Sequence, residues 1–454
     1  MEICENNGFK SIHFIGIGGV SMSALAFFML KKGVFVSGSD QKPNNFTEKL
    51  EQNGALIYLG HNESNIPYNT ELVVYTGAVK SDNPEYKEAI ERKIALMERS
   101  EFLGYVSKMY KNVIAVSGTH GKTTTTSMIG EIFIRANLKP TIHLGGECEN
   151  FGGNFYDGGG DIFITEACEY RNSFRFLNPS MSLITNIEKD HTDYYKNMQE
   201  ISLAFAQFAN NSSTVVVFEN REIEEYIDKK VNIVHCGFDE NNEIVGFNLK
   251  KHRSGCYSFD VRYNNVYIGH FDLSVMGMHN AKNALCAIAI SLLYNADYGS
   301  MYHALKNFRG VKRRYEMIGE YKGVPVVCDY AHHPTEIVNS IKGALTSHKK
   351  ILCIFQPHTY TRTLALIDEF ATCFKGVHRL VIYKTYPARE NPIDGGRAID
   401  LLNSVKNMRG RKFYCYSKKC LERTLKDMDK TYDLILVLGA GDIYEVCKKI
   451  IAKL

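Results

Sequence analysis

The chain has 454 residues, 44% of them hydrophobic and 23% charged, and this length predicts several domains that each bury a core. A formal net charge of +4 without any basic run argues against a nucleic-acid partner, and no apolar run is long enough to span a membrane. The twelve cysteines form no Cys-x-x-Cys pair and no signal-peptide pattern opens the chain. We therefore expect a cytoplasmic protein with reduced thiols and no membrane partner.

The first part of the chain, to about Tyr110, alternates short apolar runs with helical patterns. Such alternation predicts a mainly parallel sheet with helices packed on it. Strands are expected at 12–15, 34–36 and 72–75, and helices at 23–32 and 84–92.

A glycine-rich loop follows the first expected strand. Gly16, Gly18 and Gly19 precede a helix, whose N-terminus is suited to bind a phosphate. Asp40 follows the next strand, where a carboxylate would reach a ribose hydroxyl. Ser21 replaces the third glycine of the dinucleotide pattern, so a dinucleotide and another diphosphate, such as a UDP-sugar, remain equal interpretations. A third interpretation is that these glycines serve packing alone.

A second glycine loop lies between the apolar run 113–116 and a helical pattern. Gly118 and Gly121 allow a tight turn that directs backbone N–H groups and the helix dipole at an anion. Lys122 adds a positive charge beside the phosphates, and the Thr123 hydroxyl is placed to hold Mg²⁺. The loop is shorter than the general P-loop pattern, but its position between a strand and a helix predicts binding of ATP or GTP.

Acidic residues follow two later strands of this second part, which are expected at 161–165 and 181–186. Carboxylates at the carboxyl ends of parallel strands face the crevice where ligands bind. Glu166 is therefore a candidate ligand for the Mg²⁺ at Thr123. His191 follows the second strand among several acids, which favours a second metal over a surface histidine.

The rest of the chain continues the same alternation. A further strand is expected at 214–218, an antiparallel segment at 255–273, and the last strands at 324–329, 350–356, 379–383 and 434–439. We predict an α/β protein of three domains with boundaries at 1–110, 111–312 and 313–454. The first and third are Rossmann-like, and the second contains a P-loop ATPase-like parallel sheet.

Seven motifs occur along the chain in the order found in the Mur ligase family, and the first glycine loop also resembles that family. They are Gly-Thr-His-Gly-Lys-Thr-Thr (118–124), Glu-Ala-Cys-Glu-Tyr (166–170), Asn-Ile-Glu-Lys-Asp-His (186–191), Gly-Met-His-Asn-Ala-Lys-Asn (277–283), Arg-Arg-Tyr-Glu (313–316), Asp-Tyr-Ala-His-His-Pro-Thr-Glu (329–336) and Gln-Pro-His-Thr-Tyr-Thr-Arg (356–362). The resemblance covers nearly the whole chain.

The resemblance implies a UDP-sugar on the first domain, ATP on the second and an amino acid on the third. The implied reaction transfers the γ-phosphoryl group of ATP to the lactyl carboxylate of UDP-N-acetylmuramate. The amine of L-alanine then attacks the acyl phosphate, in a step of peptidoglycan precursor synthesis. An acyl phosphate hydrolyses in water, so the domains are expected to close around it.

The resemblance also implies a role for individual residues, with two Mg²⁺ ions. The UDP-sugar contacts are Gly16, Gly18, Gly19, Val20, Ser21, Asp40 and His61. The ATP contacts are Gly118, Thr119, His120, Gly121, Lys122, Thr123, Thr124, Asn280, Asn283, Arg314 and Asp329. The amino-acid contacts are His332, His333 and Arg362. The catalytic residues are Lys122, Glu166, His191 and Arg362, and the metal ligands are Thr123, Glu166 and His191.

The chain departs from the family pattern at Cys168, where many members have Asp, and at Thr359, where some have Arg. Another member of the family, adding a different amino acid or a preformed peptide, is the nearest alternative. A nicotinamide-dependent oxidoreductase would explain the first glycine loop and Asp40 but leaves Lys122 unused. A regulatory nucleotide-binding module would explain the P-loop but not Arg362. The sequence does not predict an oligomeric state.

Overall fold

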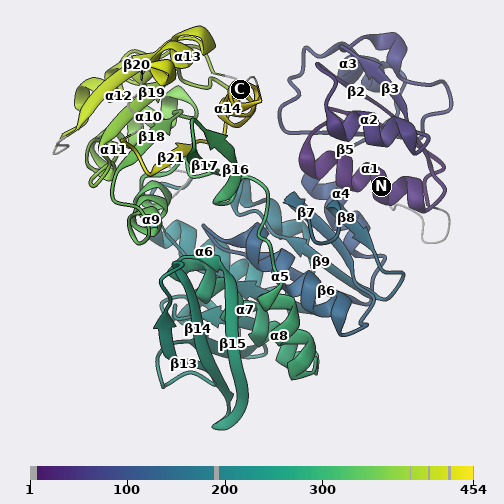
Figure 1. The fold of residues 1–454 in the computed structure, drawn as a ribbon. Helices are drawn as coiled ribbons and strands as arrows, with labels where there is room; N and C mark the ends of the chain where they lie inside the picture. Colours follow the sequence, from purple (N-terminus) through teal and green to yellow (C-terminus); the bar gives the residue numbers. More distant parts are fainter. Residues whose placement is uncertain (1–7, 189–193, 389, 407–409, 428–430, 453–454) are drawn as a thin grey trace. The chain divides into compact units, whose positions relative to one another are not determined.

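The structure is a computed structural model that describes residues 8–188, 194–388, 390–406, 410–427 and 431–452. Its strands form three sheets of five, ten and six strands, each built largely from one stretch of the sequence (Figure 1). Helices connect many of the successive strands, and the three sheets confirm the predicted three-domain α/β class.

The N-terminal sheet has the order β3-β2-β1-β4-β5, and its neighbouring strands are parallel. Its strands are β1 (Ser11–Ile15), β2 (Phe35–Asp40), β3 (Leu56–Leu59), β4 (Leu72–Tyr75) and β5 (Ala95–Glu98). Its helices are α1 (Val20–Lys31), α2 (Asn45–Gln52), α3 (Pro84–Glu91) and α4 (Arg99–Ser107). The three expected strands and two expected helices are confirmed. The other two strands, β3 and β5, were not predicted; most of their side chains are half-buried or exposed.

The ten-stranded sheet has the order β15-β14-β13-β12-β11-β10-β6-β9-β7-β8. Its strands are β6 (Asn112–Ser117), β7 (Thr141–Cys148), β8 (Gly153–Asp157), β9 (Ile162–Glu166), β10 (Met181–Ile184), β11 (Thr214–Phe218), β12 (Asn232–Gly237), β13 (Ile244–Lys251), β14 (Cys256–Tyr263) and β15 (Val266–Met276). Its helices are α5 (Lys122–Arg135), α6 (Met198–Asn210), α7 (Met278–Leu293) and α8 (Tyr298–Lys306).

The middle of this sheet positions the P-loop. Strand β6 is parallel to both β9 and β10, so the carboxyl ends of all three strands lie at one edge of the sheet. The hairpin β7–β8 extends the sheet beyond β9, and the sequence analysis did not predict it, because four glycines interrupt its apolar pattern. Helix α1 packs on this hairpin: Asn154 Nδ2 of β8 donates hydrogen bonds to Val20 O at 2.6 Å and Ser23 Oγ at 2.9 Å.

The C-terminal sheet has the order β16-β17-β21-β18-β19-β20, parallel except for the edge strand β16. Its strands are β16 (Glu316–Tyr321), β17 (Val324–Asp329), β18 (Ile351–Phe355), β19 (Arg379–Tyr383), β20 (Arg411–Cys415) and β21 (Leu434–Leu438). Its helices are α9 (Pro334–Leu345), α10 (Tyr360–Ala365), α11 (Ile367–Cys373), α12 (Ala398–Ser404), α13 (Lys418–Lys426) and α14 (Ile443–Ile451). Buried apolar clusters on the sheet make its core. In the described ranges of the chain, no helix has both the length and the apolar composition needed to cross a membrane.

Candidate active site

The P-loop backbone adopts conformations that only glycine tolerates at two positions. Gly118 has φ +139° and Gly121 has φ +84°, both in the region that disfavours L side chains. A Cβ at Gly118 would lie 2.1 Å from Thr185 Oγ1, and one at Gly121 would lie 2.5 Å from Asn283 Oδ1. The loop is therefore packed directly against the end of β10 and against α7.

Residues after β10 hold the P-loop by hydrogen bonds. The N–H of His120 donates to Asn186 Oδ1 at 2.9 Å, and Asn186 Nδ2 donates back to His120 O at 2.9 Å. The N–H of Glu188 donates to Thr119 Oγ1 at 2.8 Å. These bonds fix the loop before any ligand is present, which is the preorganisation an anion site requires.

Lys122 begins α5 and forms an ion pair with Glu169, with Nζ 2.9 Å from Oε2 and 3.1 Å from Oε1. Burial alone would lower the pKa of Lys122, but Glu169, Cys168 and Glu166 together outweigh it and raise the pKa, so the ammonium stays charged. Glu169 is a functional candidate that the sequence analysis missed, although it lies three residues after Glu166.

The side chains of Thr123 and Glu166 are in direct contact, as expected for two residues that would bind the same metal ion. Thr123 Oγ1 donates to Glu166 Oε2 at 2.8 Å, and the N–H of Gly145 in β7 donates to Glu166 Oε1 at 2.5 Å. A hydroxyl and a carboxylate are oxygen ligands that Mg²⁺ prefers, and the pair fits one such ion. Thr124, which follows in α5, is buried.

His191 lies outside the residues that the structure describes. Within the described ranges, no group of three or more histidine, cysteine, aspartate or glutamate side chains is arranged to hold a metal by itself. The second metal site therefore stays a prediction.

The glycine loop after β1 is held by β2 and its following turn. The N–H groups of Gly16 and Ile17 donate to Ser39 O at 2.8 and 3.0 Å. The N–H of Gly18 donates to Asp40 Oδ2 at 2.9 Å, and a Cβ at Gly18 would lie 2.8 Å from that oxygen. Asp40 thus fixes the loop from the position that the sequence predicted for a ribose contact. Gly19 and Val20 begin helix α1.

His61 belongs to a buried polar cluster around Glu85. Its Nδ1 lies 3.2 Å from Glu85 Oε2 and 2.9 Å from Ser39 Oγ. Burial raises the pKa of Glu85, but hydrogen bonds from His13, Ser39 and Asn65 outweigh it and lower the pKa overall. Glu85 is fully buried and ionised, so it orients His61.

Near the end of β17, Asp329 and Arg314 lie in one polar region of the C-terminal part. Burial raises the pKa of Asp329 to about 6, partly offset by Arg314 and by the N–H of Ala331, which donates to Oδ1 at 2.9 Å. The Arg314 guanidinium lies over the ring of Tyr330, 5.0 Å from its centroid, and Nη1 is 3.9 Å from Glu336. Asn280, at the start of α7, donates to Met276 O at 2.7 Å.

The two adjacent histidines have different local roles. His332 Nδ1 lies 3.3 Å from Glu336 Oε2, whereas His333 caps α9 and accepts a long 3.4 Å hydrogen bond from the N–H of Thr335. Arg362 lies in α10, which begins after Thr359 at φ +65°. Burial, with the neighbouring His332 and the guanidinium of Arg362, lowers the pKa of His358 to about 3. His358 is thus a neutral imidazole that the sequence analysis did not select.

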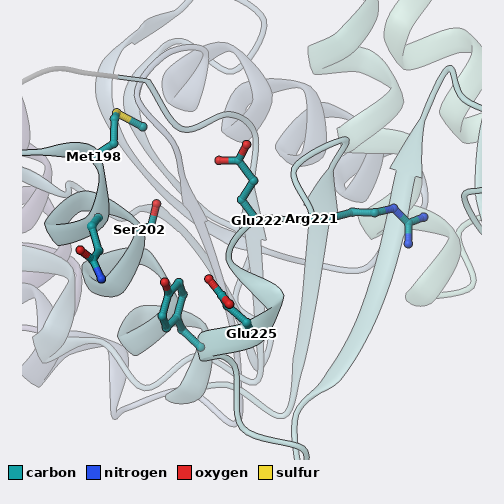
Figure 2. Close-up of a pocket in the computed structure, with 7 residues that line it drawn as sticks. Met198, Ser202, Arg221, Glu222 and Glu225 are labelled. Carbon is teal, nitrogen blue, oxygen red and sulfur yellow. The ribbon is translucent and has the colours of Figure 1, made fainter.

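A separate surface depression lies between α6 and the segment after β11 (Figure 2). It is lined by Met198, Gln199, Ser202, Arg221, Glu222, Glu225 and Tyr226. Figure 2 shows Arg221 extending away from the other labelled side chains. None of the predicted site residues lines it.

Comparisons with known proteins match the whole length of the chain. Three family models match: the Mur ligase family catalytic domain at residues 11–111, the Mur ligase middle domain at 116–291, and the Mur ligase glutamate ligase domain at 313–441. The UDP-N-acetylmuramate–L-alanine ligase of Clostridium beijerinckii is 42% identical over 97% of this chain and 97% of its own. The ligase of the same name from Caldanaerobacter subterraneus is 40% identical over 99% of this chain and 98% of its own.

Solved structures give the same result for the fold. The UDP-N-acetylmuramate–alanine ligase of Thermotoga maritima superposes with a TM-score of 0.82 at 29% identity, covering 98% of both chains. The murein peptide ligase of Psychrobacter arcticus has a TM-score of 0.75 at 24% identity, again over 98% of both chains, which supports the fold alone. Together with the P-loop and its acidic partners, these matches establish that the chain belongs to the Mur ligase family.

Proposed function

We propose that this chain is an ATP-dependent ligase that joins L-alanine to the lactyl carboxylate of UDP-N-acetylmuramate, releasing ADP and phosphate. The observation that carries the proposal is the full-length identity of 42% to a UDP-N-acetylmuramate–L-alanine ligase. The preformed P-loop with Lys122, Thr123 and Glu166 supports it independently. The product is a peptidoglycan precursor, and we place the enzyme in the cytoplasm.

The chemistry begins with the carboxylate, which is a poor electrophile because its charge repels an amine and oxide is a poor leaving group. Transfer of the γ-phosphoryl group makes an acyl phosphate, and attack by the amine then expels phosphate. Lys122 balances the charge that moves from the γ-phosphate toward ADP. Glu169 keeps Lys122 charged until the phosphates take over as its partners.

Thr123 and Glu166 would hold a Mg²⁺ ion, which when bound neutralises phosphate charge and orients the γ-phosphate. We assign His191 to a second ion beside the acceptor carboxylate. The N–H of Gly145 fixes one oxygen of Glu166, so the carboxylate keeps its orientation toward Thr123.

The remaining assignments follow the family. We propose that residues 1–110 bind the UDP-sugar, with its diphosphate on Gly16, Gly18, Gly19, Val20 and Ser21 and with Asp40 and His61 nearby. Residues 111–312 bind ATP, with Asn280 and Asn283 on the adenine side, and Arg314 and Asp329 contact ribose and phosphate. Residues 313–454 bind L-alanine through His332, His333 and Arg362.

Rapid-quench detection of acyl phosphate, with L-alanine left out, tests the metal assignments. Both Glu166→Gln and His191→Ala are expected to slow acyl-phosphate formation. The effect of Glu166→Gln is expected to be larger, because it removes the negative charge of the carboxylate proposed to bind Mg²⁺ together with Thr123. Glu222→Gln, a change in the separate surface depression, serves as the control and keeps the normal rate. Formation at the normal rate in His191→Ala would contradict its role at a metal.

A further inference from the structure

His143 of β7 is a buried histidine that the proposed chemistry does not use. Its Nε2 lies 3.0 Å from Ser21 Oγ and 3.3 Å from Ser21 O, in the first turn of α1. Its Nδ1 lies 2.9 Å from Thr165 Oγ1, in β9. The imidazole therefore bridges the glycine loop proposed for the UDP-sugar and the residue that precedes Glu166.

Only one proton is available to the ring. Burial, followed by the positive charge of Arg99, lowers the pKa of His143 to about 4, so the imidazole is neutral near neutral pH. A neutral imidazole donates from one nitrogen and accepts at the other. The ring of Phe163, 6.5 Å away between centroids, packs beside it.

The contacts at the two ends compete for that proton. Ser21 O can only accept, so it favours a proton on Nε2, with Thr165 Oγ1–H donating to Nδ1. Thr165 Oγ1 also lies 3.2 Å from Glu166 O, which can likewise only accept. When Thr165 donates to that carbonyl, its oxygen accepts from Nδ1–H, and Ser21 Oγ–H donates to Nε2. These are two discrete states of one hydrogen-bonded chain.

We infer that His143 is a positioning residue that couples the UDP-sugar loop to Glu166 by switching which ring nitrogen carries its proton. The inference rests on the proposed function for its ligand, an anionic diphosphate at the N-terminus of α1. A diphosphate offers only acceptors, so it draws the Ser21 hydroxyl proton to itself. Ser21 Oγ then accepts from Nε2–H, alongside Arg99 Nη1, which already donates to it at 3.4 Å.

At the Thr165 end of this hydrogen-bonded chain, the change affects Glu166. With the proton on Nε2, Thr165 turns its hydroxyl proton to Nδ1 and withdraws it from Glu166 O. Strand β7 also carries Gly145, whose N–H holds the Glu166 carboxylate, and His143 pairs with Thr165 in the β7–β9 register. Occupancy of the UDP-sugar loop and the state of Glu166 are therefore linked, and linkage between two sites is reciprocal.

The coupling is measured by calorimetry with UDP-N-acetylmuramate, with and without Mg²⁺ and a non-hydrolysable ATP analogue. The coupling is the ratio of the Kd for UDP-N-acetylmuramate without nucleotide to the Kd with it. In the parent protein this ratio is expected to differ from one by about fivefold or more. Thr165→Val preserves shape and removes the hydroxyl, so the ratio returns to about one while UDP-sugar binding without nucleotide stays within about twofold. Thr141→Val, on the same face of β7 with its own contact to Asp157, leaves the ratio unchanged.

Nitrogen-15 NMR of the histidine rings reports the switch directly, with His143→Phe identifying the resonance. The share of the Nε2–H form is expected to rise when UDP-N-acetylmuramate binds. An identical tautomer in both states, or a parent-like ratio in Thr165→Val, overturns the inference. A parent protein that ligates L-alanine but shows a ratio of one contradicts this inference alone. Failure to bind UDP-N-acetylmuramate contradicts the proposed function and this inference together.

Discussion

Lys122 and Glu169 form an ion pair whose side chains are only 17% and 4% exposed. Removing one partner of a buried ion pair is strongly destabilising, because the other charge is left buried and unpaired. In the proposed function, phosphate groups of ATP replace Glu169 as the partner of Lys122. The same lysine would then serve the free protein as half of an ion pair and the ATP complex as a catalytic residue.

Replacing Lys122 with Ala is expected to abolish ligation while UDP-N-acetylmuramate binding without nucleotide changes by no more than about twofold. The reason is that the lysine contacts the P-loop and Glu169 and no residue of the N-terminal glycine loop. Calorimetry measures the binding, and Lys230→Ala, a side chain that is 75% exposed, is the control. Equal loss of UDP-sugar binding and of ligation in Lys122→Ala would show that the two ligands share a site.

Asp329 gives a prediction about stability and pH. Burial raises its pKa from 3.8 to about 6 in the folded protein. Protonated Asp329 therefore contributes fully to the free energy of unfolding below its pKa in the unfolded chain, about 4. This contribution is lost as pH rises from about 4 to about 6, and the loss is at most about 3 kcal/mol.

Asp329→Asn removes this titration, so its stability relative to the parent is expected to increase between about pH 4 and about pH 7. Urea unfolding at the two pH values measures the change. The attraction of Arg314 acts only on the ionised carboxylate and is already contained in the pKa, whereas loss of the hydrogen bond from Ser340 Oγ adds an offset at both pH values. A difference between variant and parent that is the same at both pH values would contradict the raised pKa.

At the scale of elements, each proposed phosphate site is a glycine turn between a buried strand and a helix. The turn after β1 is closed by Asp40 and Asn44, and the turn after β6 by Thr185 and Asn186. Both turns are held by the neighbouring parallel strand and the loop after it. The sheet therefore places the helix N-termini before a ligand arrives.

Gly18→Ala tests the first of these turns. The added Cβ would lie 2.7 Å from Asn44 Nδ2 and 2.8 Å from Asp40 Oδ2, so these two side chains must shift and their hydrogen bonds to Gly18 are disturbed. We expect the KM for UDP-N-acetylmuramate to rise by about tenfold or more, with the KM for ATP unchanged. Gly343→Ala is the control, because a Cβ there meets no atom within 4 Å. A raised KM for ATP with normal UDP-sugar kinetics would mean that this loop has been assigned to the wrong ligand.

The sequence predicted the elements that carry a continuous apolar run, such as β1, β6, β10 and β18, because burial on both faces leaves a local pattern. It did not predict the edge strands β3, β8 and β16 or the inner strand β7, whose apolar pattern is broken by glycine or by exposure. Whether these segments form strands depends on hydrogen bonding to neighbouring strands that are distant in sequence.

The same distinction applies to the site. Gly118, Gly121 and Lys122 belong to a local motif and were predicted from it. The partner of Lys122 lies 47 residues away, and the bridge from Ser21 to His143 spans 122 residues. The first contact depends on the pairing of β6 with β9, and the second on the packing of α1 against β7 and β8. No local pattern encodes either.

At the scale of the molecule, the three sheets come largely from three stretches of sequence, and the proposed function assigns one ligand to each stretch. The proposed reaction needs all three substrates, since phosphoryl transfer requires the UDP-sugar carboxylate and turnover requires the amine. Activity should therefore be lost when any one substrate is left out.

The most direct test of this account is ADP release measured with ATP, Mg²⁺, UDP-N-acetylmuramate and each candidate amino acid in turn. We expect sustained release only when UDP-N-acetylmuramate and an amine are both present, with L-alanine the preferred amine. Sustained ADP release without the UDP-sugar would contradict the account. So would a preference for a preformed peptide over L-alanine, or a requirement for reduced nicotinamide.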